Sequence, residues 1–238
     1  MAALIVTSGA AAQADTFAPT EAHADDLDNQ GLIKGHGYVI IDTRTAESQV
    51  SERGTFYPTG EIEPDTLVII REDDGSLPGG LDIAGVERMI EAEAAGDLMA
   101  IESEGFSVTT DAELAPISLD ETVTPFGTGT FAAAPYSWSP EYSGTPIWAN
   151  NENVRASYTF NVQFGTNQVA TGRGLGYYVG YNGSEMGTWA EWYGLGVSTD
   201  GQAAGAIVPW GYIVATPKFK AYSSSIHAAT GVWTSGGV

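Results

Sequence analysis

The chain has 238 residues, of which 30 are acidic and nine are basic, and its net charge of −21 excludes the basic surface that binding to nucleic-acid phosphates requires. The same charge argues against docking on anionic lipid. Because the sequence has no cysteine, it also excludes disulfides and thiolate metal sites, and no apolar run approaches the roughly 20 residues of a membrane-spanning helix.

Charge and aromatic residues divide the chain into two regions. Residues 1–121 hold 25 of the acidic and five of the basic residues, which gives a net charge of −20, whereas residues 122–238 have a net charge of −1. All six tryptophans and nine of the eleven tyrosines follow residue 121. This contrast predicts two regions of different character that join near Glu121, rather than one interwoven domain.

The first 35 residues are predicted to form no folded unit. Residues 1–14, MAALIVTSGAAAQA, are similar to the end of a secretory signal peptide, although the charged start of such a peptide is missing. The alternative for this stretch is a plain apolar arm or strand. Residues 15–35 are predicted to be an acidic linker. The signal-like stretch predicts a secreted or extracellular protein.

Residues 36–121 are predicted to form a small, acidic α+β region. The apolar, β-branched stretches 37–43 and 66–72 are typical of buried strands. Asp82 can cap a helix over residues 83–95, because apolar residues recur there at helical spacing. Residues 102–121, which are acidic and contain proline, are predicted to connect this region to the next.

Residues 122–238 are predicted to form a Gly/Tyr/Trp-rich, all-β domain. Short strand-like runs alternate with turn residues, and no helical period of any length is present. Candidate strands cover residues 127–134, 156–162, 175–181, 188–195, 206–214, 218–223 and 231–234. The fold class predicted for the whole chain is therefore mainly β, with a small acidic α+β N-terminal region followed by an antiparallel β-sandwich or barrel.

Residues that could carry chemistry are few. The glycine pattern from Gly172 to Gly176 lacks the helix that a nucleotide-binding loop needs, and His227 with its neighbouring serines does not form a triad motif. Glu191, with Glu185 six residues earlier, is a weak candidate for a catalytic carboxylate, because it lies among tryptophans that could raise its pKa. If this stretch is a strand, Trp189 and Glu191 share one face. No metal site and no cofactor are predicted.

The aromatic residues give the stronger hypothesis. Six tryptophans in one small domain exceed what a core normally holds, so one or two should be exposed and could stack on a sugar ring or a partner. The predicted ligand-binding residues are Trp189, Trp192, Tyr193 and Trp210. We expect a secreted, non-enzymatic binding protein that acts on a glycan or a protein surface. The alternatives are a toxin-like or antagonistic protein with an acidic pro-region, a carbohydrate-active hydrolase, and a self-assembling structural protein.

Overall fold

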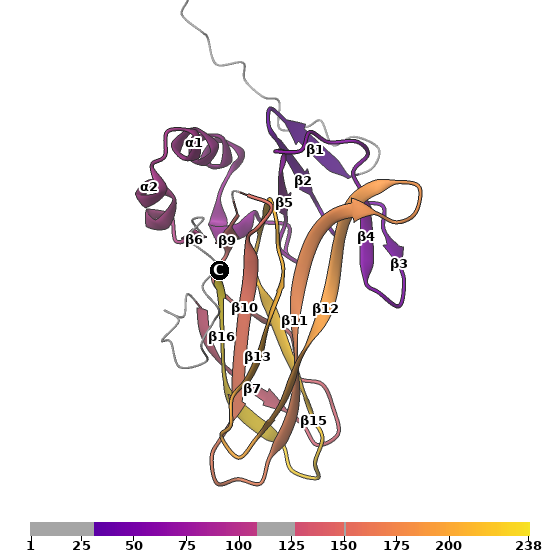
Figure 1. Ribbon diagram of the computed structural model, residues 1–238, viewed down its shortest axis with the longest axis vertical. Coiled ribbons are helices and arrows are strands. Elements are labelled where there is room, and N and C mark those ends of the chain that lie inside the picture. Colours follow the sequence, from indigo (N-terminus) through magenta and orange to yellow (C-terminus); the bar gives the residue numbers. More distant parts are fainter. Residues whose placement is uncertain (1–30, 109–126, 150) are drawn as a thin grey trace, which may run out of the picture.

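The computed structural model describes residues 31–108, 127–149 and 151–238, and within them the chain is mainly β (Figure 1). The predicted signal-like stretch and most of the predicted linker lie outside the described residues. Residues 32–35, at the end of that predicted linker, form a strand. The fold class predicted from the sequence is confirmed in its sandwich form, because the three sheets of the described residues are all open at both edges.

The strands form three sheets, in each of which neighbouring strands are hydrogen-bonded in the following order. Sheet A contains β1 (Leu32–Gly35), β2 (Tyr38–Ile41), β5 (Leu67–Ile70), β14 (Ile213–Ala215), β9 (Ile147–Trp148) and β6 (Ser107–Val108). Sheet B contains β3 (Gln49–Val50), β4 (Thr55–Pro58), β12 (Met186–Thr199), β11 (Val169–Tyr181), β15 (Lys218–Ser223) and β8 (Tyr142–Ser143). Sheet C contains β13 (Ala204–Pro209), β10 (Arg155–Val162), β16 (Ala229–Gly237) and β7 (Gly127–Ala133). A 3-10 turn (Pro78–Gly80) precedes α1 (Ile83–Ala94) and α2 (Leu98–Ser103).

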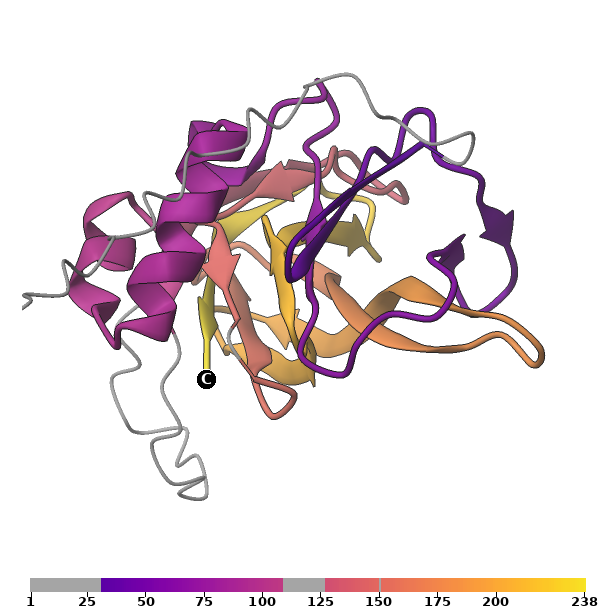
Figure 2. The same cartoon turned by 90° about the horizontal axis from the view of Figure 1, so that it is seen from above.

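The helical part of the fold follows its sequence signals. The side chain of Asp82 accepts a hydrogen bond from the backbone N–H of Gly85 at 2.6 Å, which caps α1 as predicted. Val86 and Met89 on α1 are buried against sheet A, in a core that also contains Trp148. Seen from above, α1 and α2 lie at one side of the molecule, opposite the protruding end of the β11–β12 hairpin (Figure 2).

Sheets B and C pack face to face as an antiparallel sandwich. Burial alternates strictly along β10, so that Tyr158, Phe160 and Val162 point into the core as the sequence alternation predicts. Phe160 and Phe131 from sheet C contact Phe219 from sheet B, with ring centroids 5.5 and 5.4 Å apart. This aromatic cluster is the centre of the sandwich.

The glycine pattern on β11 is explained by this packing. A Cβ atom at Gly172 would lie 2.4 Å from the ring of Phe160, and one at Gly174 would lie 2.8 Å from the ring of Tyr158. The missing side chains therefore let two large rings of sheet C approach the backbone of sheet B. The hydroxyl of Tyr158 donates a hydrogen bond to the carbonyl oxygen of Leu175 at 2.7 Å, which fixes the approach.

Strand pairing crosses the boundary that composition predicts near residue 121. In sheet A, β14 pairs with β5 and β9 pairs with β6, both in parallel, and in sheet B, β4 pairs with β12. The single strand predicted over residues 206–214 is wrong: β13 ends at Pro209 in sheet C, and β14 begins at Ile213 in sheet A. The chain changes sheets over these few residues, so the acidic and aromatic regions share a continuous framework.

No helix within the described ranges has both the length and the apolar character needed to cross a membrane.

Candidate functional site

Trp210, one of the predicted ligand-binding residues, is a core residue. It is fully buried, and its indole N–H donates a hydrogen bond to the carbonyl oxygen of Ile213 at 2.8 Å. Its ring lies edge-on to that of Tyr177, with centroids 5.1 Å apart. A ring without exposed surface cannot stack on a ligand, so this interpretation of Trp210 is corrected.

Trp189 and its neighbours lie on the face of sheet B that points toward sheet C. Trp189 is 6% exposed, and its ring centroid lies 5.0 Å from that of Phe56 on β4. The guanidinium of Arg53, between β3 and β4, lies 5.1 Å from the Trp189 ring centroid and 5.2 Å from that of Tyr178. Trp189 therefore anchors the β3–β4 hairpin to β12 within sheet B.

Both candidate carboxylates contact the same hairpin. Glu191 Oε2 lies 3.5 Å from Arg53 Nε and accepts a hydrogen bond from the Tyr193 hydroxyl at 3.0 Å. Burial and the adjacent Glu191 raise the pKa of Tyr193. Glu185 accepts a hydrogen bond from the Gln49 side chain at 3.3 Å. These contacts give the two acids a role in attaching the β3–β4 hairpin.

Trp192 lies on the opposite, outer face of sheet B, as the strand alternation predicts for a residue next to Glu191. Its half-buried ring lies 3.7 Å from the Lys220 ammonium on β15. The same ammonium lies 5.8 Å from the ring centroid of Trp138, which is 41% exposed. Two tryptophans from distant parts of the chain thus flank one lysine on the outer face.

Arg173 and Tyr222 complete this surface. Arg173 pairs with Lys220 across β11 and β15, and its guanidinium lies 5.2 Å from the Trp138 ring centroid. The Tyr222 ring centroid lies 5.4 Å from that of Trp138, with the planes tilted by 55°. We name the surface formed by Trp138, Arg173, Trp192, Lys220 and Tyr222 the Trp138 face.

Charge on the Trp138 face differs from that of the chain as a whole. Residues 122–238 contain four basic residues, and three of them, Arg173, Lys218 and Lys220, lie on the outer face of sheet B. Lys220 forms an ion pair with Glu141 at 3.2 Å. Arg173 forms no salt bridge with any described residue, and its guanidinium donors lie beside the exposed ring.

Trp138 is the residue that sequence reasoning missed. It stands in the segment Ser137-Trp138-Ser139-Pro140, which lacks the alternation of a strand, and Glu141 follows between Trp138 and Tyr142. A β-bridge to Tyr222 places it over the sheet. The one available signal was its proline- and serine-rich surroundings, since a tryptophan in such a loop is often exposed.

A cavity of about 90 Å³ lies between the N-terminal region and strands β11, β12 and β15 of sheet B. Its lining includes Glu72, Asp73, Tyr177, Thr216 and Lys218. The Thr216 hydroxyl donates a hydrogen bond to Glu72, and Lys218 forms an ion pair with Asp73 at 2.6 Å. These bonds connect the chain after β5 to the β14–β15 segment across the cavity.

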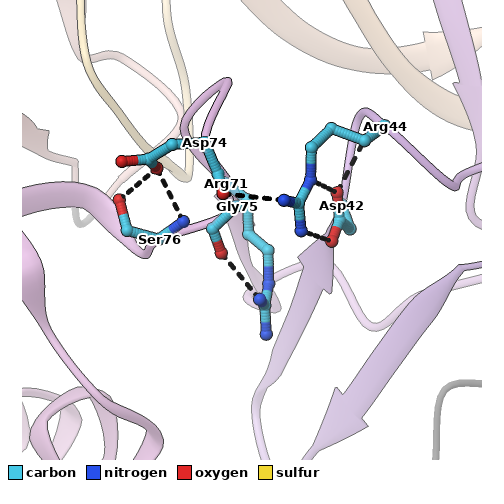
Figure 3. Close-up of polar contacts among 6 residues, drawn as sticks. All are labelled: Asp42, Arg44, Arg71, Asp74, Gly75 and Ser76. Atoms are coloured by element: carbon cyan, nitrogen blue, oxygen red, sulfur yellow. Dashed lines mark hydrogen bonds and ion pairs between the residues drawn. The ribbon is translucent and has the colours of Figure 1, made fainter.

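Charged side chains fix the loop that carries Glu72 and Asp73 (Figure 3). Arg44 donates to both carboxylate oxygens of Asp42, at 2.9 and 2.7 Å, and to the carbonyl oxygen of Asp74 at 2.7 Å. Asp74 in turn accepts from the backbone N–H and the hydroxyl of Ser76. The Arg44 side chain, with its hydrogen bond to Asp42, lowers the pKa of that carboxyl.

Burial raises the pKa of Glu72, against the opposing effects of the Thr216 hydroxyl and Lys218. A raised pKa means that the folded protein holds this proton more tightly than the unfolded chain does. The stabilisation is therefore present below the ordinary pKa and is lost as the pH rises through the folded-state value. Glu72→Gln should raise the free energy of unfolding at pH 7, by less than about 1 kcal/mol because solvent still screens the half-buried carboxyl.

Urea unfolding at pH 7 and pH 4 measures this effect, and the gain should disappear at pH 4. Glu63→Gln removes the same charge from an exposed position and is the matched control. An equal gain for both variants would attribute the effect to net charge instead of burial.

A larger hollow lies elsewhere, on the outer side of sheet C, with a volume of about 520 Å³. Its lining includes Thr130, Asn161, Thr230 and Val232, and contains no carboxylate, histidine, lysine or arginine. It therefore has neither the acid–base groups nor the charge that a reactive site needs.

No protein-family model matches the sequence, and no curated protein matches it significantly.

Proposed function

We propose that this protein is a non-enzymatic carbohydrate-binding protein that acts outside the cell and holds its glycan on the Trp138 face. The observation that carries the proposal is the exposed Trp138 ring, which is 41% exposed and lies beside two cations. An exposed indole offers an apolar plane on which the C–H face of a pyranose can stack. Adjacent cationic donors can then bind its hydroxyl or carboxylate oxygens.

Arg173 makes sugars that carry a carboxylate the preferred ligands. A guanidinium donates two parallel hydrogen bonds to a carboxylate, and Arg173 has no salt-bridge partner among the described residues. Lys220 is already paired with Glu141, so it supplies less net attraction. The expected ligand is therefore an oligosaccharide that contains uronic acid, bound more tightly than an uncharged one.

The strands hold the Trp138 face in a fixed shape, which supports this use. Lys220 is fixed by its ion pair with Glu141 and its position 3.7 Å from the Trp192 ring. Ser139, next to Trp138, accepts a hydrogen bond from the N–H of Ala221 at 3.1 Å and thereby secures the loop to β15. A surface fixed in this way loses little conformational entropy when it binds.

Calorimetric titration with a tetrameric oligouronate, and with an uncharged glucan of equal length, tests the proposal. Trp138→Ala should weaken binding of both by about tenfold or more, because stacking and cation contacts are lost together. Arg173→Gln should weaken only the oligouronate. Tyr181→Ala removes an aromatic ring that is 60% exposed at the far end of β11, and it should bind as the unaltered protein does.

Two outcomes would contradict the proposal. One is the absence of binding to either sugar at millimolar concentration. The other is an equal loss of affinity for Trp138→Ala and Tyr181→Ala, which would indicate non-specific contact of aromatic side chains. If the chain binds another protein and the Trp138→Ala variant still binds that protein, the Trp138 face is not the interaction surface.

A further inference from the structure

One end of the sandwich exposes large apolar side chains from separate segments of the chain. Phe164 lies between β10 and β11 and is 78% exposed, and Ile226 lies between β15 and β16 and is 70% exposed. Tyr136, after β7, is 59% exposed, and Val197, near the end of β12, is 56% exposed. We name the surface formed by Tyr136, Phe164, Val197 and Ile226 the apolar tip.

Strand register places these segments at the same end. Val169 at the start of β11 pairs with Thr199 at the end of β12, and its carbonyl oxygen accepts from the Ser224 N–H at 2.9 Å. Pro135 forms a bridge with Ser223. Figure 1 shows that the loops from β10 to β11, β12 to β13 and β15 to β16 lie at the lower end, away from α1 and α2.

The apolar tip is almost uncharged, although the chain has a net charge of −21. Residues 134–137, 163–168, 200–203 and 224–228 contain one carboxylate, Asp200, and one histidine, His227. Asp200 accepts a hydrogen bond from the N–H of Gly165 at 2.7 Å. One oxygen of its carboxylate therefore contacts the loop that carries Phe164. The helices α1 and α2 and the strands β1 and β2, which belong to the acidic N-terminal region, lie toward the other end of the molecule (Figure 1).

The loops of the tip have a defined shape. Three residues other than glycine in the described part of the chain have positive φ, and all three lie in this region: Tyr136 at 52°, Asn167 at 52° and Asp200 at 49°. Asn and Asp accept this conformation readily, whereas a tyrosine adopts it at a cost. The Thr166 hydroxyl also donates to the carbonyl oxygen of Gln163 at 2.6 Å. These features give the loops that carry Tyr136 and Phe164 a defined backbone conformation.

We propose that the apolar tip inserts into an electrically neutral lipid interface and attaches the protein peripherally to zwitterionic membranes. Side chains exposed by more than half on three loops and near the end of β12 suit the soft boundary between lipid headgroups and acyl chains. A membrane without net charge suits this uncharged tip, because an anionic membrane would repel the negative charge of the rest of the chain.

Co-sedimentation of the full chain with phosphatidylcholine vesicles tests the proposal, since it reports the fraction of protein bound at each lipid concentration. The double variant Phe164→Ser and Ile226→Ser should reduce partitioning by about tenfold or more, because each buried apolar side chain contributes roughly that factor. The matched control is Val50→Ser with Met99→Ser, which removes side chains that are 81% and 80% exposed in the N-terminal region. Vesicles that also contain phosphatidylglycerol should bind less protein.

Three results would overturn the proposal. They are no binding of the unaltered chain to phosphatidylcholine, an equal loss for the control double variant, and stronger binding to the anionic vesicles. Light scattering after gel filtration shows whether a second copy of the chain covers the tip instead of lipid. If the unaltered chain is a dimer, the tip variant is a monomer and neither binds vesicles, the tip is a contact between copies of this chain. None of these results depends on whether the Trp138 face binds a sugar.

Discussion

Residues 127–238 expressed alone should lose cooperative folding, although the sequence marks them as a region of distinct composition. The strand β14 lies inside sheet A between β5 and β9, and its Ile213 and Val214 are fully buried. Without the N-terminal half, Val214 loses its contacts with the helical core and Trp189 loses Phe56. Each newly exposed side chain of this size costs about 1.5–3 kcal/mol, so the two together cost about 3–6 kcal/mol, which is comparable with the whole stability of a marginal domain.

The thermal unfolding curve and the amide NMR spectrum of this fragment provide the measurement. We expect a broad transition and poorly dispersed signals, compared with a sharp transition for the full chain. Adding residues 1–108 as a separate chain should restore dispersion in part, because the missing strands are then present. A fragment that unfolds sharply on its own would contradict this expectation and would support release of the aromatic region by removal of an acidic pro-region.

Trp210→Ala should lower the free energy of unfolding by about 3–5 kcal/mol, the usual cost of removing a large buried aromatic ring. The substitution leaves a cavity beside Tyr177 and removes the hydrogen bond to the carbonyl oxygen of Ile213. Trp210→Phe should cost less, because it keeps an aromatic ring but still leaves that oxygen without the indole donor. The same residues join sheets B and A, so the loss should destabilise the whole molecule.

Urea unfolding monitored by circular dichroism measures the effect, and Trp138→Ala is the matched control. Because Trp138 is 41% exposed, its removal should cost clearly less than that of the fully buried Trp210. The two substitutions would then have different effects: Trp210→Ala would lower the free energy of unfolding, and Trp138→Ala would weaken sugar binding. A small cost for Trp210→Ala would contradict its placement in the core.

Local pattern was sufficient to predict many of the elements. The β-branched runs became β2 and β5, the capped apolar stripe became α1, and the alternation after residue 155 became β10. The expectation that Trp189 and Glu191 share a strand face opposite Trp192 is also confirmed, because Arg53 contacts the first two and Lys220 contacts the third. These features depend on residues close in sequence, which a single chain displays directly.

Pairing between distant strands could not be read in the same way. Nothing near residues 213–215 indicates that they pair in parallel with residues 67–70, because that choice depends on how two buried sheets meet. Similarly, alternation assigns Trp192 to one face of its strand but does not say which face meets solvent. The position of Trp138 beside Arg173 and Lys220 depends on a bridge to Tyr222, which lies far away in the sequence.

The indole N–H signals of the six tryptophans, recorded by NMR during titration with the tetrameric oligouronate, test the central proposal most directly. Each tryptophan gives one such signal, and single substitutions assign them. We predict shifts for Trp138 and Trp192, with the signals of the buried Trp148, Trp210 and Trp233 unchanged. Saturating shifts confined to Trp189, or no shift of Trp138 at any sugar concentration, would contradict the proposal.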